Sequence, residues 1–348
     1  MREILGAIDI GTGSVLCLAV EKTADGLGRE LVNESVITAL GAGTASDPSV
    51  RRKSIERTLK PVIGYVEKLR RAGATSISIV GTSALRRAPN RAEFVERVKR
   101  ETGLAVEVIS GEDEALLTFL GATHDLSTGT GSVMAPVMMP VVVMDVGGGS
   151  TELVFGRLGS DAHFGAKTGE PTPPELAASL PIGSLILTDR FITRYPIDSI
   201  VMELLRIDIR NILAAETVEQ IVTAAKSASE KPLLVAVGGS ATTLVAMEHE
   251  IVPYLPEKVH KRRISRSIII KHIERLGKMS LDERYRIAAL PRGRAPVIDA
   301  GLAILDELLA LFGQDAMTVS DKGLRYGVIV RDSRRGGPAR MKDECSNQ

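Results

Sequence analysis

Two stretches of the sequence decide the fold: Ile4-Leu-Gly-Ala-Ile-Asp9-Ile-Gly11-Thr-Gly13-Ser14-Val-Leu-Cys-Leu-Ala-Val20 and Val141-Val-Val-Met-Asp145-Val-Gly147-Gly-Gly149-Ser150-Thr-Glu152-Leu-Val-Phe155. Both run from an apolar strand through Asp-x-Gly-x-Gly-Ser into a second apolar strand. The pattern predicts two β-hairpins with glycine-rich tips, because glycine takes positive φ at low cost and lets backbone N–H groups approach a ligand. The repetition predicts a duplicated architecture.

A third glycine turn follows the apolar run 233–237 and leads into a helical pattern that begins at Ser240 or Ala241. Backbone N–H groups at such turns and at helix N-termini bind anions. One glycine turn alone is more often only a tight turn, but three together favour a phosphate site. The candidate phosphate-binding residues are Gly11, Thr12, Gly13, Ser14, Gly147, Gly148, Gly149, Ser150, Thr151, Gly238, Gly239 and Ser240.

Between these landmarks, strands alternate with amphipathic helices, which predicts an α/β fold with mixed sheets. Helices are expected over 53–72, 91–102 and from 112 to 121, and strands over 77–80 and 106–109. A break is expected at 124–140, a surface loop at 159–175 and a frayed polar tail from Arg334.

The composition limits the class of protein. The 44 basic and 43 acidic residues give a formal net charge of +1, and aromatic residues make up 3% with no Trp. Neither a basic field nor a base-stacking platform for nucleic acid is expected. A membrane span needs about 20 apolar residues, and the longest uncharged apolar run, 134–144, contains two prolines. With two cysteines and no secretory signal, the chain is expected to be cytoplasmic.

Further motifs carry a resemblance to a known family: Gly81-Thr-Ser-Ala-Leu-Arg86-Arg-Ala-Pro-Asn90, Ile109-Ser-Gly111-Glu-Asp-Glu114-Ala, Ser179-Leu-Pro-Ile-Gly183-Ser-Leu-Ile-Leu-Thr-Asp-Arg190-Phe and Ser320-Asp-Lys-Gly-Leu-Arg325-Tyr-Gly. With the three glycine turns, the chain resembles the exopolyphosphatase and guanosine pentaphosphate phosphohydrolase family, nearly end to end. This implies two actin-like (ribonuclease H-like) domains with mixed sheets facing a central cleft. Residues 1–124 would form the first domain, with a C-terminal helix over 320–333 packing back on it, and 125–319 the second. At this length, the extra C-terminal helical domain of longer members is not expected.

The resemblance also implies residue roles. Glu114 stands where the family carries its catalytic glutamate, which would orient and deprotonate water. Arg86 stands at a substrate-binding arginine, whose guanidinium can fork across two phosphate oxygens. A solvated acidic helix turn and a surface ion pair are the competing interpretations. The first tip departs from the family, with Gly13 in place of Asn and Leu16 in place of a basic or polar residue.

Asp9, Asp145 and Glu152 flank the two hairpin tips, and their hard carboxylate oxygens suit Mg²⁺ or another divalent cation. We therefore predict Asp145, Asp9 and Glu152 as metal ligands, with Asp145 and Glu152 also catalytic. Turn capping by aspartate before glycine is the alternative.

The sequence thus predicts a metal-assisted exopolyphosphatase that releases orthophosphate from inorganic polyphosphate. The alternatives are a guanosine pentaphosphate phosphohydrolase, a low-turnover sensor of polyphosphate or of guanosine tetra- or pentaphosphate, and a kinase on the same scaffold. The basic run 258–263 with Arg266, Arg292 and Arg294 is a candidate path for a polyanion. Whether the chain is a homodimer stays open.

Overall fold

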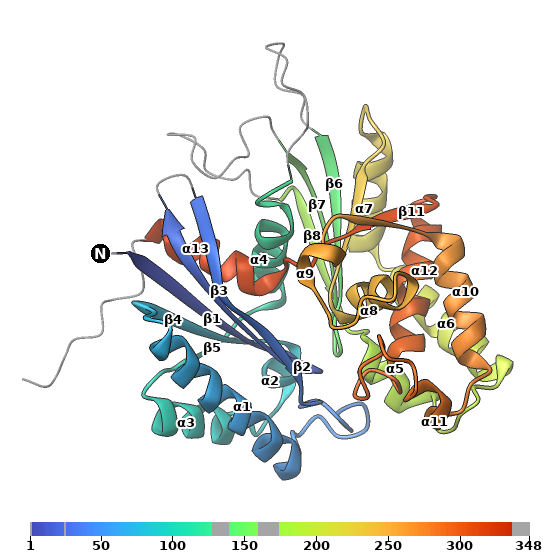
Figure 1. Cartoon of the computed structure of the whole chain (residues 1–348). Helices are drawn as coiled ribbons and strands as arrows, with labels where there is room; N and C mark the ends of the chain where they lie inside the picture. The colour runs from blue at the N-terminus through green and yellow to red at the C-terminus, as the bar shows by residue number, and fades with distance from the viewer. Residues whose placement is uncertain (1, 24–25, 127–138, 159–173, 336–348) are drawn as a thin grey trace, which may run out of the picture.

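The computed structural model describes residues 2–23, 26–126, 139–158 and 174–335, which form two mixed β-sheets with helices around them (Figure 1). The first sheet has the strand order β3-β2-β1-β4-β5 and the second β10-β11-β9-β6-β7-β8. The strands are β1 Glu3–Ile10, β2 Ser14–Thr23, β3 Gly26–Ile37, β4 Ser76–Gly81, β5 Val106–Val108, β6 Met139–Val146, β7 Thr151–Leu158, β8 Leu176–Leu180, β9 Leu233–Val237, β10 Arg262–Ser265 and β11 Ala316–Val319. The predicted α/β class is confirmed.

The duplication is visible in the pairing of the strands. In the first sheet β1 and β2 form an antiparallel hairpin and β4 pairs parallel to β1. In the second sheet β6 and β7 form the hairpin and β9 pairs parallel to β6. Both predicted hairpins are therefore confirmed, and each brings an aspartate to the end of its first strand.

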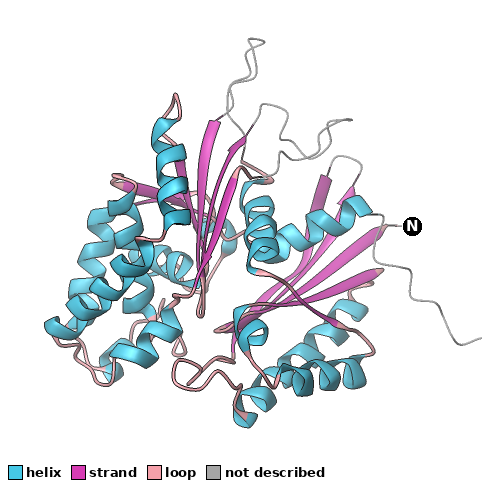
Figure 2. Ribbon diagram, turned by 180° about the vertical axis from the view of Figure 1, so that it is seen from behind, coloured by secondary structure: helices cyan, strands magenta, loops and turns pink. Residues whose placement is uncertain are grey.

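Helices cover the outer faces of both sheets (Figure 2). The first sheet packs α1 and α3 on one face and α13 on the other, while α5, α6, α7, α8 and α12 share a core with the second sheet. The helices are α1 Arg52–Arg71, α2 Ser83–Arg87, α3 Arg91–Thr102, α4 Gly111–Thr123, α5 Ser184–Phe191, α6 Ser199–Leu213, α7 Glu216–Ser227, α8 Gly239–Glu248, α9 Pro256–Val259, α10 Arg266–Gly277, α11 Leu281–Arg284, α12 Ile298–Leu311 and α13 Leu324–Arg335.

Helix α4 lies between the two sheets. Its Leu117 packs with residues of β1, β2 and α13, whereas Ala115 and Phe119 pack with residues of β6, β7 and β9. The helix is therefore apolar on two sides, and both sheets fix its position. The predicted domain boundary at 124/125 stays a prediction, because α4 belongs to both cores.

Helices α4 and α13 cross at two glycines. A Cβ on Gly327 would lie 2.5 Å from the carbonyl carbon of Leu117, and one on Gly121 would lie 2.7 Å from the backbone nitrogen of Gly327. Contacts between real Cβ atoms and backbone are not that short, so only glycine allows the two helix backbones to approach this closely. This crossing brings the end of the chain back onto the first sheet.

The last helix begins later than predicted, at Leu324 rather than residue 320. Ser320 follows β11 directly, and its hydroxyl accepts a hydrogen bond from the backbone N–H of Lys322 at 3.0 Å. Such a side-chain contact favours a turn over a first helical turn. The predicted loops at 124–140 and 159–175 and the tail lie largely outside the described residues.

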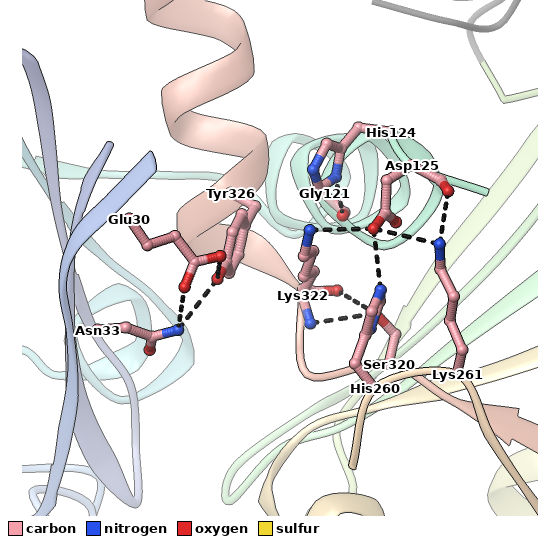
Figure 3. Close-up of polar contacts among 10 residues, drawn as sticks. All are labelled: Glu30, Asn33, Gly121, His124, Asp125, His260, Lys261, Ser320, Lys322 and Tyr326. Atoms are coloured by element: carbon pink, nitrogen blue, oxygen red, sulfur yellow. Dashed lines mark hydrogen bonds and ion pairs between the residues drawn. The ribbon is translucent and has the colours of Figure 1, made fainter. Parts of the chain in front are cut away.

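A polar cluster joins three chain segments where the chain passes between the sheets (Figure 3). Asp125, just after α4, accepts hydrogen bonds at Oδ2 from His260 Nε2 and Lys322 Nζ, both at 3.0 Å. Lys261 Nζ donates to the Asp125 carbonyl oxygen at 2.8 Å. Burial alone would raise the pKa of the Asp125 carboxyl, but the hydrogen bonds from His260 and Lys322 lower it.

The glycine crossing yields a stability prediction. Gly327→Ala is expected to lower the free energy of unfolding by about 1–3 kcal/mol, because the new methyl group forces α4 and α13 apart. Guanidinium chloride unfolding measures this. Gly64→Ala is the matched control, since Gly64 is exposed inside α1 with nothing within 4 Å of a new Cβ. It should stabilise by roughly 0.5–1 kcal/mol. Equal destabilisation by both variants would contradict the crossing argument.

Candidate active site

The two hairpin tips have the same turn and touch each other. The N–H of Gly11 donates to the Ser14 carbonyl at 2.9 Å, and the N–H of Gly147 donates to the Ser150 carbonyl at 3.0 Å. A Cβ on Gly148 would lie 3.0 Å from the backbone nitrogen of Gly13, and one on Gly149 would overlap the Thr12 side chain. None of the tip glycines is in the left-handed region, so positive φ, the first predicted reason for glycine, is wrong here. The predicted approach of their backbone N–H groups to a ligand stays a prediction. Gly148 and Gly149 are needed for the close approach of the second tip to the first.

Four carboxylates converge on the space beside these tips. Asp9 and Asp145 stand near the ends of β1 and β6, Glu152 lies in β7, and Glu114 lies in the first turn of α4. Asp9, Glu114 and Glu152 are buried, and Asp145 is partly buried. The structure therefore brings together residues from both hairpins and from the helix between the sheets.

Glu114 is held in place from the side of the first sheet. Ser110 caps α4 by accepting a hydrogen bond from the N–H of Asp113, which fixes the first turn. Arg86, on the short helix α2, donates from Nη1 to Glu114 Oε2 at 2.8 Å and to the Ile109 carbonyl at 3.1 Å. In this arrangement Arg86 orients Glu114, and its predicted contact with substrate stays a prediction.

Two further side chains, not singled out by the sequence analysis, hold the other carboxylates. Thr118, one turn after Glu114 on α4, donates to Asp145 Oδ2 at 3.4 Å. Ser179, on β8, donates to Glu152 Oε1 at 2.8 Å. The only signal for Thr118 in the sequence is its spacing: a polar residue four positions after Glu114 shares its helix face.

The electrostatics of the cluster oppose ionisation. Burial, followed by repulsion from Glu114 and Asp145, raises the pKa of Asp9 to about 8. Burial and the charge of Glu114 also raise the pKa of Asp145 and of Glu152. For Glu114, burial raises the pKa although the hydrogen bond and charge of Arg86 counteract it. Perturbed carboxylates gathered in one place are typical of a functional site.

The third glycine turn lies next to this cluster. Gly238 has a φ of 90°, and a Cβ on it would lie 2.6 Å from the Val146 carbonyl oxygen and 2.9 Å from Asp145 Oδ1. The backbone at Gly238 therefore reaches Asp145. The Ser240 side chain instead lies against Gly301 of α12, and the Thr151 hydroxyl donates to the Ile182 carbonyl at 2.8 Å. Both hydroxyls contact other parts of the second domain.

The carboxylate cluster offers oxygen ligands for a cation. Within the described ranges, no three acidic, His or Cys side chains form a ready-made metal cluster. Mg²⁺ usually takes one or two protein carboxylates and fills its other positions with water and substrate phosphate. Asp9 Oδ1 and Thr12 Oγ1 are buried and have no hydrogen-bond partner in the described part of the chain. The donor chemistry and these orphaned oxygens fit a hard divalent cation.

The basic run in the second half is largely engaged within the protein. His260 and Lys261 contact Asp125, and Arg266 Nε donates to Asp306 at 2.6 Å. Arg294 lies elsewhere, with its guanidinium against Gly239 at the start of α8. Of the basic residues predicted to contact a polyanion, Arg294 is therefore better placed to do so than the run 258–263, because it lies next to the third glycine turn.

Comparison with known proteins decides the family. Residues 19–335 match the model of the Ppx/GppA phosphatase family. The chain is a member of this family. Exopolyphosphatase 2 of Mycobacterium tuberculosis is 29% identical, covering 94% of this chain and 97% of that protein. Guanosine-5'-triphosphate,3'-diphosphate pyrophosphatase of Vibrio parahaemolyticus is 28% identical, covering 99% of this chain and 63% of that protein.

Among solved structures, a Ppx/GppA enzyme of Aquifex aeolicus has a TM-score of 0.71 at 30% sequence identity, covering 95% of this chain and all of that one. The predicted two-domain, actin-like architecture of the Ppx/GppA family is thereby confirmed. The predicted roles of individual residues are not tested by these similarities, and they stay predictions.

The raised carboxylate pKa values predict how stability depends on pH. Asp9 has a pKa of about 8 when folded and about 4 when unfolded, so the folded state binds more protons between these values and loses stability as pH rises. In EDTA, the free energy of unfolding at pH about 8.5 should be about 1–3 kcal/mol lower than at pH about 6. Denaturant unfolding at both pH values measures this.

Asp9→Asn provides the control for this pH dependence. The amide has nearly the shape of the carboxyl group but does not titrate, so the difference in stability between the two pH values should shrink. An unchanged difference in the variant would show that Asp9 is not the titrating group.

Proposed function

We propose that this member of the Ppx/GppA family is an exopolyphosphatase that cleaves the terminal phosphoanhydride bond of inorganic polyphosphate. The observation that carries the proposal is the convergence of Glu114, Asp145 and Glu152 beside the two touching glycine tips. The proposal is supported by curated relatives named exopolyphosphatase, which match over almost their entire length.

In the proposed reaction, water attacks the terminal phosphorus in line with the anhydride oxygen. The P–O bond to the rest of the chain breaks, and orthophosphate leaves. Glu114 takes the proton of the attacking water, because Arg86 holds its carboxylate at a fixed position. Backbone N–H groups of the glycine turns bind the phosphate oxygens.

One or two of the carboxylates of Asp9, Asp145 and Glu152 would hold a divalent cation, with Mg²⁺ the best match to hard carboxylate oxygens. Such a cation supplies positive charge to the phosphate oxygens and relieves the mutual repulsion of the buried carboxylates. Thr118 and Ser179 fix two of these carboxylates through hydrogen bonds. Activity is expected to disappear in EDTA and to return on addition of Mg²⁺.

We place this activity in the cytoplasm, where polyphosphate and guanosine penta- or tetraphosphate would be available, and expect neither nucleic acid nor lipid as a partner. Wherever the structure describes a helix, none has the length and apolar run that crossing a bilayer requires. The near balance of basic and acidic residues gives no overall field that would hold nucleic acid or an anionic membrane.

The catalytic role of Glu114 predicts the effect of its replacement. Glu114→Gln should lower kcat for phosphate release by about 10²–10⁴-fold, because the amide cannot accept the proton of water. Glu112→Gln is the matched control, since Glu112 is exposed in the same helical turn and should keep full activity. Substrate binding by Glu114→Gln should persist. Tight binding without phosphate release, unaffected by Glu114→Gln, would support a sensor instead. Equal phosphate release by the native chain and by Glu114→Gln would show that Glu114 is not the base.

Guanosine pentaphosphate is the second candidate substrate, because the relative from Vibrio parahaemolyticus is named for that type of reaction. The same phosphoanhydride chemistry applies to its terminal 5'-phosphate. We expect kcat/KM to be higher for polyphosphate, as measured by phosphate release from both substrates at equal terminal-phosphate concentration. A pronounced preference for the nucleotide would assign the chain to the second activity.

A further inference from the structure

Helix α6 presents an apolar stripe outward. Ile200, Leu204 and Ile207 are 69%, 50% and 43% exposed, whereas Leu205 and Ile209 on the opposite side are fully buried. These three belong to the six large apolar side chains that are exposed in the described part of the chain. Their spacing of four and then three residues, continued by exposed Asn211, is the spacing of a coiled-coil seam.

Ion pairs fix the orientation of this stripe. Arg206 Nη1 lies 2.7 Å from both Asp306 and Glu307 of α12. On the other flank, Arg190 of α5 lies 2.8 Å from Asp208. A rotation of α6 that buried the stripe would break both sets of contacts. The apolar face is therefore held outward by the fold.

We infer that α6 is the contact between two copies of this chain, paired antiparallel about a two-fold axis. The charged residues beside the seam carry this inference. Glu203 and Arg210 lie along one edge of the helix, where they form an ion pair at 2.5 Å. In an antiparallel pair, Glu203 of each copy comes to lie beside Arg210 of the other copy, so the edge is complementary to itself.

The same residues argue against parallel pairing. In a parallel pair, Glu203 of one copy would face Asp208 of the other, because side chains five positions apart meet across a parallel seam. Like charges there are unfavourable. In the antiparallel pair, Leu204 of each copy packs on Ile207 of the other, and the Ile200–Asn211 layers lie at the ends of the seam.

The expected dimer is weak and leaves the cleft open. One helix pair is smaller than the roughly 1,200 Å² that a stable interface buries in total, so association should depend on concentration. Helix α6 packs in the core on one face of the second sheet, and α4 packs on the other face. The carboxylate cluster therefore lies away from α6, and activity per subunit should not change on association.

Sedimentation of the full chain from about 1 to about 300 μM tests this inference. The weight-average mass should rise from the 37.2 kDa of one chain toward twice that value. Leu204→Glu should raise the dissociation constant at least about tenfold, with unchanged phosphate release. Val252→Glu, at an apolar side chain that is 55% exposed outside α6, is the control and should associate like the native chain. A native chain that stays monomeric throughout, or association that survives Leu204→Glu, would overturn the inference.

Charge reversal tests the antiparallel arrangement separately. Glu203→Arg and Arg210→Glu should each weaken association, because each places like charges on the shared edge. The double variant should recover it. Arg210→Glu removes the ion pair between Arg210 and Glu307, and the double variant lacks the same ion pair. Recovery of association in the double variant therefore cannot come from better folding. Additive weakening in the double variant would exclude this pairing.

Discussion

The placement of α4 between the two sheets is the constraint on which the rest of the structure depends. A helix in that position must be apolar on two sides, and it must approach α13 closely enough to share the first sheet with it. Gly121 and Gly327 provide that approach, because a side chain at either position would overlap the opposite backbone. The N-terminus of α4 then lies beside both hairpin tips. The position of Glu114 is therefore set by the packing of α4 against α13, away from the carboxylate cluster.

This packing concentrates negative charge in a region that water reaches poorly. Arg86 neutralises part of it through Glu114, but the described residues place no comparable cation against Asp9, Asp145 or Glu152. Buried carboxylates without a cationic partner destabilise a folded protein, and the usual result is that they bind a proton or a metal. Without a metal, the unfavourable burial of negative charge raises the pKa of Asp9, so that its carboxyl group binds a proton more readily. A positively charged ligand bound at this cluster would therefore stabilise the fold.

The sequence predicted the parts of the site that depend on local pattern. Apolar strands on either side of Asp-x-Gly-x-Gly-Ser predict a hairpin from the local pattern alone, so Asp9 and Asp145 could be placed at strand ends. Positive φ was the wrong reason for glycine at the tips, and the need for glycine at position 149 arises only because Thr12 of the other tip lies against it. Thr118 and Ser179 were missed for the same reason, since their partners are more than twenty residues away.

The two hairpins also differ in a way that only the strand register reveals. Asp145 faces Glu152 across its hairpin, whereas Asp9 at the corresponding position faces Leu16. A carboxylate at position 16 would add a further negative charge to a cluster in which Asp9 is already repelled by two others. An apolar residue there limits the repulsion and leaves the second hairpin as the one with paired carboxylates. The duplicated halves therefore have unequal roles: the second hairpin supplies most of the charge, and the first closes against it through Thr12 and adds a single aspartate.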